Sequence, residues 1–213
     1  MAKQRDVESS LRGILRGFGL KVGAVSKGRF AARIRELVAG QVRLERVVGP
    51  LLRARTALRA EYATLHRELL EAVRGDEVCR RLMTIPGVGP VVAMTFRSAI
   101  DQPERFAHSK AVGAHFGLVP RKYQSGEIDR TGRISKVGDA MVRTALFEAA
   151  NVMLTRAVRF SALKAWAMRV ASRQGAKKAK VALARKLAVV MHRMWLEGTE
   201  FRWGRQATPA AAA

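Results

Sequence analysis

The feature that most constrains the fold is a regular apolar pattern between residues 42 and 73. Apolar side chains recur there at alternating steps of four and three positions: Leu44, Val48, Leu51, Leu58, Tyr62, Leu65 and Leu69. This is the heptad spacing of a helix that buries a narrow stripe against one partner helix. We therefore expect a long helix that either forms a coiled-coil dimer or packs against the rest of its own chain. The narrowness of the stripe favours the dimer.

Two residues disturb this pattern. Arg55 stands where the spacing requires an apolar residue, and we expect its stem to pack along the seam while its charged head extends into solvent. Pro50 has no backbone N–H to donate within a helix, so the helix is either kinked there or begins again with Pro50 as its first residue.

Helical periodicity also dominates the rest of the chain. One-sided apolar patterns predict helices over residues 7–15, 29–38, 136–153, 161–173 and 176–197. Ser135 and Asp139 are both candidate caps for the helix that follows them. A further short helix is expected around residues 108–115.

The charge of the chain indicates its class of partner. Lysine and arginine number 40 against 17 aspartate and glutamate, giving a formal charge of +23 at pH 7. No globular fold requires such an excess, which instead attracts polyanions and makes nucleic-acid binding tight and salt-sensitive. The basic residues are spread over many predicted helices and are not gathered on one interfacial helix, so nucleic acid is favoured over a membrane surface.

Other kinds of site receive little support from the composition. The single cysteine, Cys79, excludes an internal disulfide and a multi-cysteine zinc site, and it is expected in the core. The histidines (His66, His108, His115 and His192) show no metal-ligand spacing, and no acidic cluster is suited to two metal ions. No apolar run approaches the roughly 20 residues of a membrane span, so we expect a cytoplasmic protein.

A glycine-rich turn between two helical segments is the first candidate for nucleic-acid contact. The sequence Pro86-Gly87-Val88-Gly89-Pro90 joins them, and its two glycines would let a phosphate approach backbone N–H groups at a helix start. The pattern is that of a helix-hairpin-helix motif, although a bare helix connection could use the same glycines. The fold class expected is therefore all-α: a helical domain with a helix-hairpin-helix motif, preceded by a long coiled-coil helix.

The least helical segment, residues 116–139, is the second candidate. It holds four glycines and five basic residues around Ser125, and it is expected to form a surface loop. A serine beside a flexible glycine could attack a phosphodiester while nearby cations stabilise the developing charge. The ordinary alternative is a turn that contacts phosphate, and Tyr123 is a rival nucleophile. The basic residues expected to bind DNA are Arg121, Lys122, Arg130, Arg133 and Lys136.

The order of motifs from residue 82 to 156 resembles the carboxy-terminal domain of the insertion-sequence-110 family of transposases. The motifs are IPGVGP, RF, GLVPR, SG and the helix start ISKVGD. In that family the serine of the SG motif is the proposed nucleophile, which corresponds to Ser125. The resemblance implies DNA transposition by serine attack on a phosphodiester, in a bacterial, nucleoid-associated protein.

The resemblance also implies partners and an organisation. It suggests amino-terminal helices with a coiled-coil dimerisation region (residues 1–80), a transposase domain (81–206) and a disordered tail (207–213). DNA and a structured guide RNA are the expected partners, with a homodimer through the coiled coil, and two such dimers could pair into a tetramer. Family members carry a RuvC-like acidic domain that binds Mg²⁺. The chain shows no such domain, so a truncated form is expected, with no cofactor bound by this chain itself.

Three functional classes follow from these observations. The first is the catalytic part of a transposase with Ser125 as nucleophile. The second is a non-catalytic module that binds nucleic acid, dimerises and regulates a full-length relative. A basic ribosome-associated or RNA-chaperone protein fits the charge but leaves the order of motifs unexplained.

Overall fold

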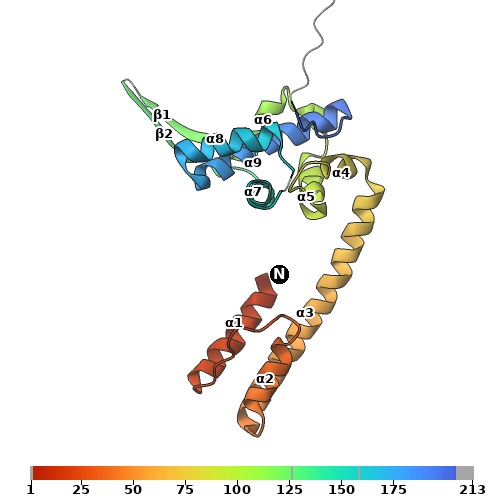
Figure 1. Cartoon of the computed structure of the whole chain (residues 1–213), viewed down its shortest axis with the longest axis vertical. Helices are drawn as coiled ribbons and strands as arrows, with labels where there is room; N and C mark the ends of the chain where they lie inside the picture. Colours follow the sequence, from red (N-terminus) through yellow and green to blue (C-terminus); the bar gives the residue numbers. More distant parts are fainter. Residues whose placement is uncertain (1, 126, 158, 205–213) are drawn as a thin grey trace, which may run out of the picture. The chain divides into compact units, whose positions relative to one another are not determined.

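A computed structural model describes residues 2–125, 127–157 and 159–204, in two compact units, Met1–Glu68 and Leu69–Ala213. Nine α-helices and one two-stranded sheet are assigned within the described residues, and this confirms the predicted, mainly helical fold (Figure 1). The tail predicted to be disordered, 207–213, lies outside the described residues.

The first unit is built from α1 (Ala2–Gly17), α2 (Phe30–Val38) and the first part of α3 (Val42–Gly75). These three helices share a small core, and the first half of the heptad stripe contributes Leu44 and Val48 to it. The amino-terminal half of the stripe therefore packs within its own chain. Helix α3 runs through Pro50 without a break, so the helix does not begin again at that residue.

The prediction that Arg55 extends its head into solvent is wrong. Its side chain is only 3% exposed, and its guanidinium donates to Oε1 of Glu8 at 2.7 Å and to the carbonyl of Lys27 at 2.9 Å. It also lies 4.8 Å from the ring centroid of Phe30. Arg55 is buried because α1 supplies a carboxylate that compensates its charge.

The second half of the heptad stripe is different. Leu58, Tyr62 and Leu65 are 38%, 39% and 63% exposed, and the Tyr62 ring stacks on His66 with the centroids 5.8 Å apart. We call these three exposed residues the α3 stripe.

The second unit is organised around α9 (Ala176–Glu197). Four helices contact it: α4 (Glu77–Leu82), α6 (Ser109–His115), α7 (Ala140–Thr155) and α8 (Ala162–Gln174). A further helix, α5 (Pro90–Ile100), packs on α4 and α7, and the short 3-10 helix Pro103–Arg105 lies against α9. This unit holds the larger core, in which Cys79 is buried as predicted.

Local sequence signals account for several helix ends of this unit. Asp139 caps α7, because its Oδ1 accepts from the N–H groups of Met141 at 2.6 Å and Val142 at 3.1 Å. Ser161 caps α8 in the same way, by accepting from the N–H of Lys164 at 3.1 Å. Of the two caps considered for α7, the aspartate is thus the one used.

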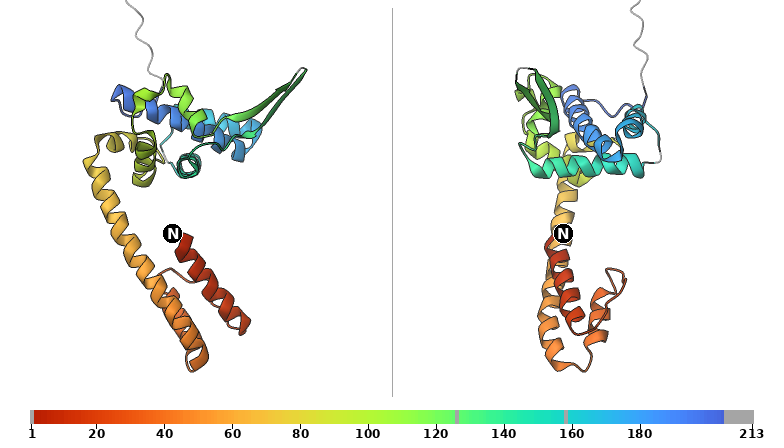
Figure 2. Two further views of the ribbon diagram at one scale, coloured as in Figure 1. Left: turned by 180° about the vertical axis from the view of Figure 1, so that it is seen from behind. Right: turned by 90° about the vertical axis from the view of Figure 1, so that its left-hand side faces the viewer.

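The segment predicted as a surface loop forms an antiparallel hairpin, so that prediction is wrong. Strands β1 (Pro120–Ser125) and β2 (Ile128–Ile134) pair Lys122 with Thr131 and Ser125 with Ile128. All of β1 is exposed, and the hairpin reaches out from the helical body of its unit (Figure 2).

Every helix within the three described ranges falls short of the length and apolar content that crossing a bilayer requires.

Candidate nucleic-acid interface

The pairing of the hairpin divides its side chains between two faces. Tyr123 pairs with Arg130, and Ser125 pairs with Ile128 near the turn. Because side chains alternate along a strand, Ser125, Tyr123 and Arg130 share one face, while Lys122 lies on the other. Gly126, the other half of the SG motif, lies outside the described residues. The structure thus places both candidate nucleophiles and one arginine together on an exposed surface.

Gly132 leaves room for Tyr123 on this face. A Cβ at Gly132 would lie 3.2 Å from a ring carbon of Tyr123, which crosses to β2 above the glycine. The ring remains 57% exposed. Tyr123 therefore presents a flat aromatic surface next to Ser125, suitable for stacking on a base.

The base of the hairpin is fixed to the helical body by close backbone packing. Gly117 and Gly138 both have left-handed φ angles, of 64° and 84°. A Cβ at Gly117 would lie 2.2 Å from the carbonyl oxygen of Val137, and a Cβ at Gly138 would lie 2.1 Å from that of His115. Only glycine allows the two ends of the hairpin to approach this closely.

The side chain of Arg143, on α7, also fixes the base of the hairpin. Its Nη1 lies 3.2 Å from the carbonyl oxygen of Phe116, 3.0 Å from that of Val137 and 2.8 Å from that of Gly138. One guanidinium thus connects both ends of the hairpin to α7, whose inner face belongs to the core. We call Gly117, Gly138 and Arg143 the hairpin anchor. Arg143 carries no signal in the sequence, because an arginine on an amphipathic helix looks like any other solvated side chain.

The remaining basic candidates do not gather around Ser125. Arg121 lies near the base, where its Nη2 donates to the carbonyl of Ser135 at 2.9 Å. Lys136 is also at the base, with a left-handed φ of 58° and its N–H bonded to the carbonyl of Gly117. Arg133 lies on the part of β2 next to the base, where the pairing is irregular. The hairpin therefore carries positive charge along its length and is not a compact cluster at its tip.

The two glycines of the second candidate site have different surroundings. Gly87 has a φ of 87° in a turn closed by the Val88 N–H on the Ile85 carbonyl, with Pro86 before it. A Cβ at Gly87 would lie 2.5 Å from the carbonyl oxygen of Ala149, so this glycine allows the turn to pack on α7. Gly89 has open space around its Cα and precedes Pro90, the first residue of α5. Gly89 is thus the more accessible of the two to a phosphate.

Two further kinds of chemistry find no support in the structure. Burial, and to a lesser extent the nearby carboxylate of Asp76, raises the pKa of Cys79 to about 12. The thiol therefore stays protonated at neutral pH. Within the described residues no group of three histidine, cysteine, aspartate or glutamate side chains could hold a metal ion. These residues therefore supply no three-ligand metal centre of their own.

Comparisons with known proteins find a family model and several relatives that are similar to this chain. Residues 79–166 match the family described as "Transposase IS116/IS110/IS902 family". The transposase for insertion sequence element IS1111A of Coxiella burnetii is 28% identical over 202 residues, covering 92% of this chain and 55% of that protein.

Two other relatives show similar coverage. A Pseudomonas aeruginosa protein named "Probable family 20 transposase" is 32% identical over 204 residues, covering 92% of this chain and 60% of its own length. The transposase for insertion sequence element IS1328 of Yersinia enterocolitica is 33% identical over 159 residues, which cover 71% of this chain and 48% of that protein. The chain thus spans about half to three fifths of the length of these curated relatives.

Proposed function

Residues 79–166 form a transposase domain of the IS116/IS110/IS902 family, and from this premise we propose that the chain binds DNA and transfers DNA strands through Ser125. The observation that carries this proposal is the exposed hairpin, which presents Ser125, Tyr123 and Arg130 on one face. Its base is fixed by the hairpin anchor, and Ser125 itself is exposed next to the turn.

The proposed step is a phosphoryl transfer to serine. The Oγ of Ser125 forms a bond to the phosphorus of a DNA phosphodiester, and the bond from that phosphorus to one bridging sugar oxygen breaks. Serine loses its proton and the leaving oxygen gains one, so atoms and charge balance. Arg130 is placed to stabilise the negative charge on the phosphate oxygens during attack.

The other candidate residues are proposed to bind DNA and not to react. Lys122 and Arg133 would contact phosphates along the hairpin, together with the parts of Arg121 and Lys136 that the hairpin base leaves available. Gly87 and Gly89 would bring backbone N–H groups close to a phosphate at the start of α5. Family resemblance adds a structured guide RNA as a second nucleic-acid partner. No step is assigned to Mg²⁺, because family resemblance places its binding in the RuvC-like domain.

The α3 stripe is proposed as the dimer contact. Leu58, Tyr62 and Leu65 follow heptad spacing and are exposed, whereas the earlier positions Leu44 and Val48 are buried within the chain. A second copy of α3 would cover the exposed positions. Pairing of such dimers would give a tetramer.

The experiment that tests the proposal is detection of a covalent protein–DNA adduct on a denaturing gel. The purified chain is incubated with DNA carrying the junction of an insertion-sequence end, guide RNA and Mg²⁺, beside the variants Ser125→Ala and Tyr123→Phe. We expect an adduct with the wild-type chain and with Tyr123→Phe, and none with Ser125→Ala. An adduct that survives in Ser125→Ala but disappears in Tyr123→Phe would assign the chemistry to the tyrosine.

A second candidate function is a non-catalytic module that binds nucleic acid. The observation in its favour is that the basic side chains of the hairpin lie along its length and near its base and do not gather around Ser125. Salt-sensitive DNA binding without an adduct, together with reduced transposition when the chain is co-expressed with a longer relative, would support this function.

A further inference from the structure

An open groove of about 670 Å³ lies in the second unit, and no residue of the hairpin lines it. It is bounded by one side of α8, the facing side of α9 and the segment 199–202 that follows α9. Its floor is apolar and includes Leu163, Val190 and Met194. A groove of this volume is large enough for a nucleotide.

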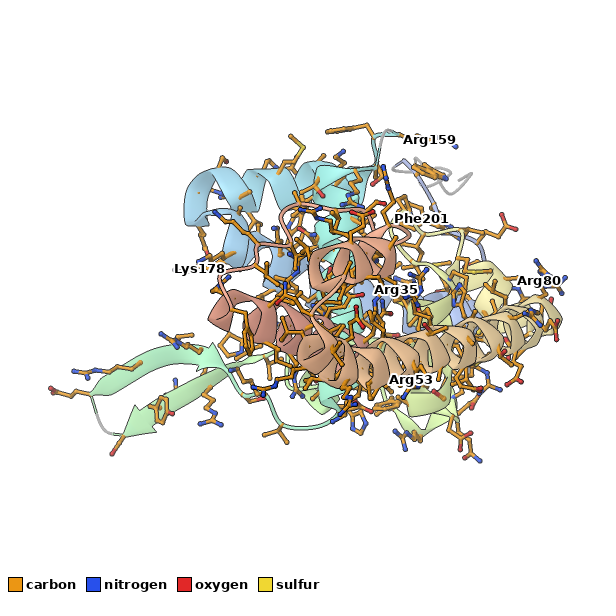
Figure 3. All side chains as sticks on the ribbon, turned by 90° about the horizontal axis from the view of Figure 1, so that it is seen from below. Arg35, Arg53, Arg80, Arg159, Lys178 and Phe201 are labelled. Carbon is orange, nitrogen blue, oxygen red and sulfur yellow. The ribbon has the colours of Figure 1, made fainter. Side chains whose placement is uncertain are left out.

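The segment that closes the groove is held in place at several points. The N–H of Phe201 donates to Oγ1 of Thr84 at 2.9 Å, and the N–H of Thr199 donates to the carbonyl of Met194 at 3.1 Å. One residue beyond the segment, the carbonyl of Trp203 accepts from the N–H of Ala162 at 3.0 Å. Phe201, labelled in Figure 3, is only 9% exposed. The groove is therefore part of the folded unit and requires no rearrangement to form.

Trp166 provides the aromatic surface of the groove. Its indole is partly exposed, and the ammonium of Lys186 lies 4.4 Å from the ring centroid. Stacking of a nucleic-acid base is stronger than an exposed cation–π contact, so a base can replace the ammonium on this face. Lys186 would then be free to contact the phosphate of the same nucleotide.

The charged groups around the groove favour an anion. Arg193 and Glu197 pair with each other at 2.6 Å, and Glu200 is the other carboxylate of the lining. The lining also contains three cations, Arg169, Lys186 and Arg202, so its positive charges outnumber Glu200. These cations form no ion pair with any residue that the structure describes. The groove is therefore positive around its apolar floor and the ring of Trp166.

We propose that this groove binds an unpaired nucleotide of single-stranded nucleic acid, with the base on Trp166 and the phosphate between Arg169, Lys186 and Arg202. An aromatic platform with cations at its rim is the arrangement by which proteins bind single strands without reading their sequence. This inference deepens the proposed function and rests on its nucleic-acid binding. The groove would hold a strand that strand exchange leaves unpaired.

The test uses the full chain with Ser125→Ala, so that no covalent product at Ser125 interferes. The probes are a short oligothymidine with one 5-iodo-deoxyuridine and its RNA counterpart with 5-iodouridine, which crosslink to a stacked aromatic ring on irradiation. We expect the crosslink to map to Trp166 by mass spectrometry. A stronger crosslink with one of the two probes identifies DNA or RNA as the source of the nucleotide.

Binding affinities give the second measurement. Trp166→Leu should weaken single-strand binding about five- to thirty-fold, and Trp166→Phe, which keeps an aromatic ring, should weaken it much less. If Trp166→Leu does not fold, the exposed double variant Arg169→Gln with Arg202→Gln tests the same site, with an expected loss of about five-fold or more. The control is Lys178→Gln, on the exposed first turn of α9 (Figure 3), which removes one charge outside the groove.

Three results would overturn the inference: crosslinks that map outside the groove, equal losses for Lys178→Gln and the groove variants, or competition by polyglutamate as effective as by the oligonucleotide. Equal competition by polyglutamate would show that the groove recognises negative charge alone, such as that of an acidic peptide. Failure of the proposed function is distinguishable, because a chain that crosslinks at Trp166 but forms no adduct in the wild type retains the groove and lacks the chemistry at Ser125.

Discussion

Gly87 and Gly89 stand two residues apart in one turn, but the structure makes different demands on them. Gly87 combines a φ of 87° with a Cβ position 2.5 Å from the Ala149 carbonyl oxygen. Gly89 has an extended backbone, with φ −101° and ψ −179°, and nothing within 4 Å of its Cβ position. A side chain is therefore excluded at the first position and allowed at the second.

We expect Gly87→Ala to destabilise the second unit by about 2–4 kcal/mol, because it adds backbone strain to a steric clash with α7. Gly89→Ala should change stability by less than about 1 kcal/mol. Urea unfolding followed by tryptophan fluorescence measures both, since all three tryptophans lie in this unit. Equal stabilities of the two variants would contradict the assigned packing. If Gly89 contacts phosphate, its variant should lose DNA affinity without losing stability.

Arg143 is the side chain on which the position of the hairpin most depends. Replacing it with alanine removes three hydrogen bonds from a charged donor to Phe116, Val137 and Gly138, and should cost about 1–3 kcal/mol of local stability. We expect faster amide hydrogen exchange at residues 116–119 and 135–138, and a lower adduct yield, with duplex affinity nearly unchanged.

Arg130→Ala is the matched control for Arg143→Ala. It also removes one arginine, but from the exposed part of the hairpin, so exchange at the base should stay as in the wild type. If amide exchange at the hairpin base is unchanged in Arg143→Ala, then Gly117 and Gly138 hold the hairpin without the arginine.

At the scale of elements, α1 is attached to α3 through a charge pair. Burial alone would raise the pKa of Glu8, but hydrogen bonds from Gln4 and Arg55 and the charges of Arg55 and Arg59 outweigh it, so the pKa is lowered from 4.5. The ionised form is thus favoured by folding. The stability it contributes is present above pH 4.5 and is lost as the pH falls through the lowered pKa of the folded state.

We expect Glu8→Gln to destabilise the first unit at neutral pH by about 1–2 kcal/mol, because Arg55 would keep a buried charge without its carboxylate. The difference between variant and wild type should shrink as the pH falls below 4.5. Amide hydrogen exchange in α1 and α2 measures this unit separately. If the stability difference between variant and wild type is the same at neutral pH and below pH 4.5, Glu8 acts through packing alone.

The sequence predicted helices better than it predicted the hairpin, and the reason is burial. Helix α9 was predicted with its observed limits, because its apolar face is buried and Gly175 and Gly198 bound it. All of β1 and residues 129–133 of β2 are exposed, so no alternation of apolar and polar residues marks these strands. The available signal was the two-residue connection Gly126-Glu127 between Ser125 and Ile128, a composition typical of tight hairpin turns. Arg55 was misjudged because its partner Glu8 lies 47 residues away in the sequence.

At the scale of the whole molecule, the formal charge of +23 predicts how DNA binding depends on salt. Each lysine or arginine that neutralises a phosphate releases counterions, and the slope of log affinity against log salt changes by about 0.9 for each such contact on duplex DNA. The slope therefore counts the cations that touch phosphate, whatever the remaining charge of the chain.

We expect the double variant Arg130→Gln with Arg133→Gln to lower the slope by about 1–2 and to weaken binding to all duplex sequences alike. The control is Arg33→Gln, which removes a surface charge already paired with Glu36 at 3.3 Å. Its slope should match that of the wild type, as should that of Ser125→Ala, which removes no charge. Fluorescence anisotropy with one labelled duplex over a series of salt concentrations gives all four slopes. If the hairpin variant and Arg33→Gln change the slope equally, DNA binding follows the total charge of the chain, and the hairpin has no special place in it.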